Sequence, residues 1–186
     1  MKIKITKSKI YGSVTAPSSK SISHRAIIVA ALSHGRSKLT NVLIADDIEQ
    51  TIYALRQFGV KITKKDTSVI IDGSKGKLQR PDNAIEVGNS GSSIRLLTAV
   101  SGLVDGLTVL TGEKRLCERP MADLFDPLKR MGITARSIKR NGCPPLEVIG
   151  GRIKGGEVTV NGNISSQFIS ALLLIAPFAE DKTTIL

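Results

Sequence analysis

Aromatic residues are scarce in this sequence of 186 residues: there is no Trp, and aromatic residues make up 3% of the chain. Modules that bind single-stranded nucleic acid usually stack the bases on aromatic side chains. The sequence also has no block of consecutive basic residues of the kind found in nucleic-acid-binding arms. These features disfavour a nucleic-acid-binding domain, and we expect no nucleic-acid partner.

Cysteine and long apolar runs are scarce as well. Cys117 and Cys143 have neither CxxC spacing nor a neighbouring His cluster, so we expect no metal site and no disulfide framework, as in a reducing cytosol. The apolar run at 171–179 is too short to span a membrane and contains Pro177, so it predicts a core helix. The first residues, "MKIKITKSKI", alternate like a strand and lack the apolar core of a signal peptide. We therefore expect a cytoplasmic protein with no membrane partner.

Acidic residues are fewer than basic ones, 16 against 27, which gives a formal net charge of +11. Such a surface attracts anions, whether phosphates, nucleic acid or acidic lipid. A hydrophobic fraction of 41% argues against disorder, and the length suffices for one domain or a large part of one.

One pattern occurs three times along the chain. The copies are "SHRAIIVAALSHGRSKLTNV" from Ser23, "SIRLLTAVSGLVDGLTVLTG" from Ser93 and "SQFISALLLIAPFAEDKTTIL" from Ser166, roughly 70 residues apart. Each begins with hydroxyl groups, continues as an almost wholly apolar helix, breaks at a short turn and ends like a strand. The seven apolar residues at 26–32 predict that this first helix is buried.

A second module lies between these copies, at 51–73 and at 123–151. In both, an amphipathic helix ends at a glycine, Gly59 or Gly132, and two short strands follow as in a hairpin. In the third unit, the chain stops before such a module. The repeats predict a mixed α/β (α+β) fold: a pseudo-threefold lobe with apolar helices at its centre, sheets and amphipathic helices outside, and an incomplete third unit.

Small polar residues precede each apolar helix: "SSKSIS", "GNSGSS" and "GNISS". Pseudo-threefold symmetry would bring the three helix N-termini to one end of the lobe. Helix N-termini bind anions through unpaired amides and a partial positive charge, but Ser and Asn are also the commonest N-caps. Capping and a shared anion pocket both remain open for these sites.

Basic side chains accompany the same helix starts. Lys20 adds positive charge at the positive end of the first helix dipole, so something negative should offset it. Arg25 and Arg95 occupy equivalent places in the first two copies, where an arginine usually has a carboxylate or phosphate partner. Ligand and structural ion pair are both open for Arg25, whereas a structural ion pair is favoured for Arg95. For His24, a packing or surface role is favoured.

Four motifs, "PSSKSISHRA", "GNSGSSIRLL", "ERPMADL" and "GNISSQFISALLL", occur in the order found in a known family. Together they resemble the 3-phosphoshikimate 1-carboxyvinyltransferases, also called 5-enolpyruvylshikimate-3-phosphate (EPSP) synthases. The resemblance implies transfer of the enolpyruvyl group of phosphoenolpyruvate to the 5-hydroxyl of shikimate 3-phosphate, with release of phosphate and no metal or organic cofactor. The reaction belongs to chorismate and aromatic amino-acid biosynthesis.

The resemblance also implies an architecture. Members have two lobes of three βαβαββ units each, an inside-out barrel in which helices are buried, and are monomeric. Residues 1–16 would be a strand of the other lobe, residues 17–186 the shikimate-3-phosphate-binding lobe with its third unit incomplete, and the C-terminal lobe would be absent. That lobe supplies the main acid and base residues, so we expect the isolated chain to bind substrate weakly and not to turn over.

The motifs assign roles by position. Shikimate 3-phosphate would be bound by Lys20, Ser21, Arg25, Ser165, Ser166 and Gln167. Phosphoenolpyruvate would be bound by Lys20, Gly91, Arg119 and Gln167, with support from Asn89 and Arg95. Lys20 would thus contact both substrates.

Three positions depart from the usual family pattern: Ser18 replaces a frequent Gly, His24 a frequent Asn, and Ser92 a Thr or Ala. Gly91, which is present, implies a geometry sensitive to the inhibitor glyphosate. The sister family that acts on UDP-N-acetylglucosamine is a rival assignment, but its reactive cysteine has no match because Cys117 is too close to Arg119. A basic RNA-binding α/β domain and a non-catalytic anion-binding lobe are further hypotheses for a chain of this charge.

Overall fold

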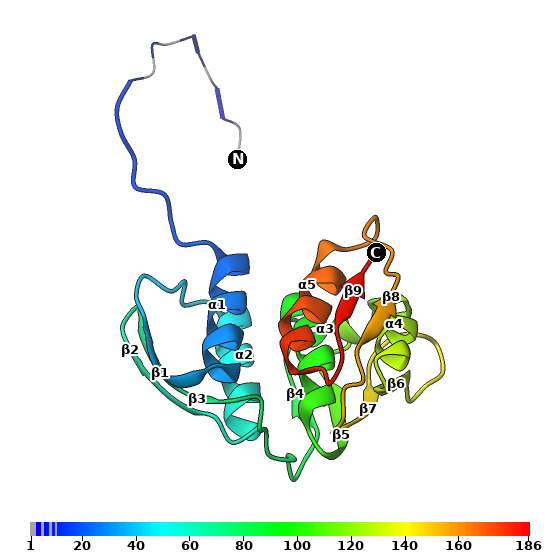
Figure 1. Ribbon diagram of the computed structural model, residues 1–186. Coiled ribbons are helices and arrows are strands. Elements are labelled where there is room, and N and C mark those ends of the chain that lie inside the picture. The colour runs from blue at the N-terminus through cyan, green and yellow to red at the C-terminus, as the bar shows by residue number, and fades with distance from the viewer. Residues whose placement is uncertain (1–2, 5, 8, 10) are drawn as a thin grey trace.

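The computed structural model describes residues 3–4, 6–7, 9 and 11–186, and its apolar helices lie between two larger sheets (Figure 1). The first repeat unit forms an antiparallel sheet with the order β1-β3-β2, packed against two helices. Its elements are α1 (Lys20–Leu32), β1 (His34–Leu39), α2 (Asp46–Gln57), β2 (Lys61–Lys65) and β3 (Ser68–Ser74).

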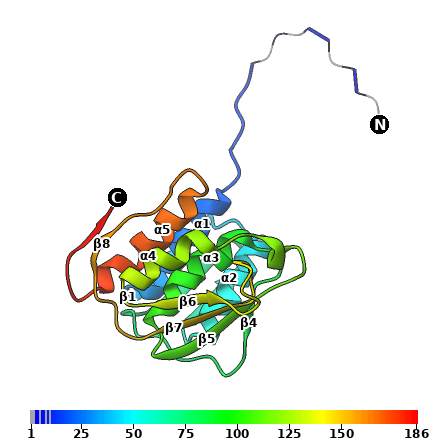
Figure 2. The ribbon, with the colours of Figure 1, turned by 90° about the vertical axis from the view of Figure 1, so that its right-hand side faces the viewer.

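The second unit forms a four-stranded sheet with the order β4-β5-β7-β6. Its elements are β4 (Ile85–Glu86), α3 (Gly91–Val100), β5 (Gly106–Thr111), α4 (Phe125–Arg130), β6 (Thr134–Ser137) and β7 (Leu146–Gly150), with short 3₁₀ turns at Ser101–Leu103, Leu116–Glu118 and Ala122–Leu124. The third unit contains β8 (Gly156–Val158), α5 (Ser166–Ile175), a 3₁₀ turn at Ala176–Phe178 and β9 (Thr183–Ile185), with β8 and β9 parallel. Helices α3 and α5 pack alongside each other in similar orientations (Figure 2).

The predicted local structure is confirmed in both complete units. The hairpins are β2–β3 and β6–β7, each antiparallel, and the amphipathic helices α2 and α4 are followed by glycines with positive φ, Gly59 at 84° and Gly132 at 87°. A left-handed residue after a helix favours glycine because it has no Cβ to clash. The second of these helices, α4, has six residues and begins after a 3₁₀ turn.

The core lies between the helices, as the repeats predict. Helix α3 is buried on nearly every side, packing against α2 and α5, while α1 packs on β3 and α2. The predicted mixed α/β lobe, with apolar helices inside and sheets outside, is therefore confirmed.

One face of α1 corrects the prediction that the whole apolar run is buried. Val29 and Ile22, two helical turns apart, are 54% and 69% exposed, and Leu173 of α5 is 57% exposed. Side chains of α1, α5 and the following turn line an open apolar groove of about 200 Å³ there: Val29, Leu32, Ser33, Leu173, Leu174, Pro177 and Phe178. Because no other element of the described chain covers this groove, the apolar face stays in solvent.

Residues 11–19, directly ahead of α1, extend away from the rest of the chain (Figure 1), and the described residues before α1 contain neither helix nor strand. The predicted strand at 1–16 falls partly on positions 1–2, 5, 8 and 10, which lie outside the described residues, so it stays a prediction. No helix in the described part is both long and apolar enough to cross a bilayer.

Candidate anion-binding site

Serine caps the N-terminus of each of the three apolar helices. The side-chain oxygens of Ser19, Ser90 and Ser165 accept hydrogen bonds from the backbone amides of Ile22, Ser93 and Gln167, at 3.3, 3.2 and 3.2 Å. The capping interpretation is thus confirmed. A cap satisfies only part of the first turn, whose four amides have no partner within the helix, so capping leaves amides free for an anion.

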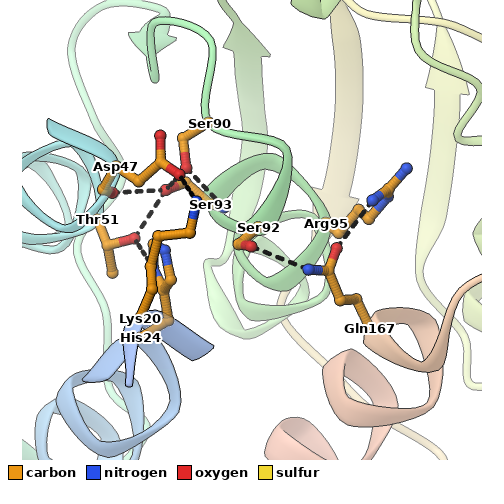
Figure 3. A network of polar contacts seen from close by, with 9 residues as sticks. All are labelled: Lys20, His24, Asp47, Thr51, Ser90, Ser92, Ser93, Arg95 and Gln167. Atoms are coloured by element: carbon orange, nitrogen blue, oxygen red, sulfur yellow. Dashed lines mark hydrogen bonds and ion pairs between the residues drawn. The ribbon is translucent and has the colours of Figure 1, made fainter. Parts of the chain in front are cut away.

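Side chains connect the starts of these helices directly. Gln167 at the start of α5 donates from Nε2 to Ser92 Oγ in the first turn of α3, at 2.9 Å (Figure 3). Arg25 of α1 donates from Nη2 to Ser170 Oγ of α5 at 2.8 Å, and from Nη1 to the Ser21 carbonyl at 2.9 Å. The N-terminal halves of α1, α3 and α5 are therefore brought together, as pseudo-threefold symmetry predicts.

Lys20 has the negative partner that its position requires. As the first residue of α1, it places Nζ 2.6 Å from Asp47 Oδ2 in the first turn of α2 (Figure 3). Asp47 also stabilises its own helix, since a carboxylate favours a helix N-terminus. Sequence reasoning missed Asp47, although the "DD" that begins the amphipathic helix signals an acidic first turn.

The two arginines differ from the expectation of a carboxylate partner. Arg25 forms no ion pair with the described chain, and neither does Arg95. Arg95 instead donates from Nη1 to Gln167 Oε1 at 2.8 Å and lies with Cζ 5.5 Å from the centroid of the Phe168 ring. The structural ion pair predicted for Arg95 is thus replaced by an amide and an aromatic face.

Arg119 lies beside the start of α3. A Cβ added to Gly91 would overlap Arg119 Nη1, so this glycine lets the guanidinium approach the first turn. Burial, and then the nearby charge of Arg119, lowers the pKa of Arg95 below its ordinary value. The supporting residue Asn89 donates from Nδ2 to the Glu113 carboxylate, which anchors the turn before α3. Arg95 and Arg119 are thus cations placed close together at a helix N-terminus.

A buried chain of polar side chains lies behind these groups. His24 Nδ1 is 2.8 Å from Thr51 Oγ1, which is 2.8 Å from Ser93 Oγ, and Ser93 contacts Ser90 Oγ at 2.6 Å (Figure 3). His24 is fully buried, which confirms its packing role, and burial lowers its pKa from 6.5 to about 4. Sequence reasoning missed Thr51 and Ser93 as partners, because no local pattern connects residues so far apart.

The predicted residues fall in two groups. At the starts of α1 and α5 lie Lys20, Ser21, Arg25, Ser165, Ser166 and Gln167; at the start of α3 lie Asn89, Gly91 and Arg95, with Arg119 beside them. Gln167, a member of the first group, contacts the second group through hydrogen bonds with Ser92 and Arg95 of α3. No group of three metal-ligating side chains occurs within the described ranges.

The α/β lobe with its buried apolar helices defines a class of protein: an inside-out α/β lobe in which helix N-termini meet beside basic side chains. Comparison with known proteins is more specific. Residues 5–186 match the model of the family described as EPSP synthase (3-phosphoshikimate 1-carboxyvinyltransferase). The chain belongs to the EPSP synthase family.

Similar proteins support this assignment. The chain is 47% identical over 185 residues to 3-phosphoshikimate 1-carboxyvinyltransferase of Methanosarcina mazei, covering 100% of this chain and 43% of that protein. It is 46% identical over 169 residues to the protein of the same description from Methanothermobacter thermautotrophicus, covering 91% and 40%. The solved structure of EPSP synthase from Acinetobacter baumannii matches with a TM-score of 0.85 and 34% identity, covering 94% of this chain and 40% of that chain. The chain therefore spans about two fifths of the length of these relatives.

Proposed function

We propose that this chain is the shikimate-3-phosphate-binding lobe of an enzyme that transfers the enolpyruvyl group from phosphoenolpyruvate to the 5-hydroxyl of shikimate 3-phosphate. The observation that carries the proposal is the meeting of three helix N-termini with Arg25, Arg95 and Arg119, which form no ion pair with the described chain. Two free cysteines fit the reducing cytoplasm that we propose as its location.

The two substrates explain why basic groups gather there. Each brings a phosphate and a carboxylate, so four anionic groups must lie close together before the reaction. Arginine and lysine offset their repulsion and orient the reacting atoms, as positioning and electrostatic stabilisation require. The reaction that we propose uses no metal.

We assign shikimate 3-phosphate to the starts of α1 and α5 and phosphoenolpyruvate to the start of α3. Shikimate 3-phosphate would be held by Ser21, Arg25, Ser165 and Ser166. Phosphoenolpyruvate would be held by the Gly91 amide and Arg119. Lys20 and Gln167 would contact both, since Gln167 already joins the two helix starts. Asp47 keeps Lys20 Nζ directed toward the start of α2.

We infer that residues 17–186 form one lobe whose third unit is completed by a segment present in the longer relatives. The exposed apolar face of α1 and α5 supports this, because a third amphipathic helix would occupy there the place that α2 takes between α1 and α3. Residues 1–16 would pair with the second lobe. The groups that move protons would lie in that lobe, so the 186-residue chain should release no phosphate from the two substrates.

The proposal is tested by an NMR titration of the chain with shikimate 3-phosphate, with unphosphorylated shikimate as the matched ligand. We expect phosphate-dependent shifts at the amides of Ser21, Ser165 and Ser166 and at the Arg25 side chain, and loss of these shifts in Arg25→Gln. A folded spectrum that responds equally to both ligands, or to neither, would overturn the proposed binding site.

Replacing Gly91 by Ala should weaken the binding of phosphoenolpyruvate by about tenfold or more, because a lost charge-assisted contact is worth about 1.5–3 kcal/mol. The added methyl group would overlap Arg119 Nη1, the far end of a flexible side chain, so the fold should tolerate the change while the guanidinium moves away. Isothermal titration with each substrate measures the effect. Shikimate 3-phosphate serves as the internal control and should change less than about twofold; equal losses for both would contradict separate subsites.

A further inference from the structure

Two helices hold the first turn of α3 from opposite sides. One is α1, through its fifth residue His24, and the other is α5, through its second residue Gln167. Gln167 reaches Ser92 directly at 2.9 Å, and His24 reaches Ser93 through Thr51 of α2, over two contacts of 2.8 Å (Figure 3). The start of α3 is thus joined to all three neighbouring helices.

The hydrogen bonds that connect His24 to Ser90 have one consistent assignment of donors and acceptors. Ser93 Oγ donates its single hydrogen to the Asp47 carbonyl at 3.1 Å, so it accepts from Thr51 and from Ser90. Thr51 therefore has no hydrogen left for His24, and His24 must donate from Nδ1. This assignment leaves Nε2, which has no partner among the described residues, as a lone pair and avoids a buried N–H without an acceptor.

The hydrogen-bonded side chains from His24 to Ser90 are buried away from water. His24, Thr51 and Ser93 are 0% exposed, and Ser90 is 1% exposed. A buried network whose members are nearly all satisfied is stiff, whereas removing one member strands the others. The last two members of this network are Ser90 and Ser93. Ser90 is the N-cap of α3 and accepts a hydrogen bond from the Ser93 amide, and it directly precedes Gly91.

We propose that His24 and Thr51 are positioning residues for the anion subsite at the start of α3: through Ser93, they fix its first turn to α1 and α2. Neither touches the anion. They act by holding the Ser90 cap, and hence the Gly91 amide, in one orientation relative to Arg119. This inference rests on the proposed function for the identity of the anion, but the fixing of the turn is independent of it.

Thr51→Val tests the proposal, because it keeps the shape of the side chain and removes only the linking hydroxyl. The matched control is Thr98→Val, also in a fully buried position and on α3 itself, whose hydroxyl bonds only to the Ile94 carbonyl of its own helix in the described structure. In the free chain, we expect hydrogen exchange at the Ser93 and Ile94 amides to rise roughly tenfold in Thr51→Val and to stay near the parent rate in Thr98→Val. Equal exchange in the two variants would overturn the inference.

Ligand binding provides the functional readout. With phosphoenolpyruvate as the probe, Thr51→Val should raise the dissociation constant about fivefold or more, shikimate 3-phosphate should change less than about twofold, and Thr51→Ser should restore most of the loss. Equal losses for both ligands would overturn the inference, because they would indicate a general structural effect. If the parent chain binds neither ligand while exchange still rises in Thr51→Val, the proposed function fails and the positioning role stands.

The assigned proton position on His24 can be tested on the parent chain, so this test does not depend on whether a variant folds. Nitrogen-15 shifts of the His24 ring at neutral pH should show the proton on Nδ1 and a bare Nε2. A proton found on Nε2 would mean that Thr51 donates to His24 and Ser93 donates to Thr51, so Ser93 would no longer donate to the Asp47 carbonyl of α2. That result would overturn the assigned bond directions and the fixing of Ser93 to α2 through this carbonyl.

Discussion

Phe168→Ala should destabilise the chain by about 3–5 kcal/mol, a large part of the roughly 5–15 kcal/mol that holds a domain of ordinary stability together. Phe168 is among the largest fully buried side chains, and its ring lies against Arg95. Its removal would leave a cavity between α3 and α5 and would also take the aromatic face away from the Arg95 guanidinium. Urea unfolding followed by circular dichroism measures the loss as a lower midpoint with an unchanged slope.

The same helix offers the matched control. Leu173 of α5 is 57% exposed at the open groove, so Leu173→Ala should cost less than about 1 kcal/mol. Similar losses for the two variants would mean that packing on α3 is not what holds α5 in place.

Lowering the pH from 6.5 to about 4 should cost the chain on the order of 3 kcal/mol through His24 alone. Burial lowers the pKa of this ring, and the charges of Lys20 and Arg25 lower it further, while Asp47 acts in the opposite direction. Within this window, the unfolded chain binds a proton that the folded chain does not, so falling pH favours unfolding. Below about pH 4, the ring is protonated in both states, and this contribution levels off.

The measurement is the free energy of unfolding in urea at several pH values between 6.5 and 4. His24→Asn, which keeps a polar side chain that does not titrate, should flatten this dependence, whereas His34→Gln at the exposed start of β1 should leave it unchanged. Other groups titrate in the same window, so the difference between parent and variant is the quantity to compare. An identical slope in the parent and in His24→Asn would contradict a neutral, buried imidazole.

Arg95 and Arg119 place two positive charges beside the start of α3 in the candidate site. Two partly buried cations close together are unfavourable without an anion, and burial has already lowered the pKa of Arg95. In the absence of an anion, Gln167 and the Phe168 ring offset part of this cost. An anion that paired with both arginines would relieve it, which is the physical reason that we propose a phosphate or carboxylate at the start of α3.

The sequence by itself determined the elements of the fold and the serine caps of its apolar helices. Apolar runs, glycines after amphipathic helices and paired short strands are local signals, so the repeat units, the hairpins and the Gly59 and Gly132 helix ends followed from them. Serines before each apolar helix likewise predicted the caps, and the repeat predicted that the three helix N-termini lie at one end of the lobe.

Tertiary structure alone decided the partners of the polar side chains that connect different helices. Lys20 pairs with Asp47 and His24 with Thr51 across 27 residues, and Arg95 with Gln167 across 72, separations at which no periodicity operates. The exposure of Val29 was decided in the same way, because a helix with no polar face is buried only where another element covers it. Local patterns select helices, strands and caps; packing between distant segments selects the contacts that position the site.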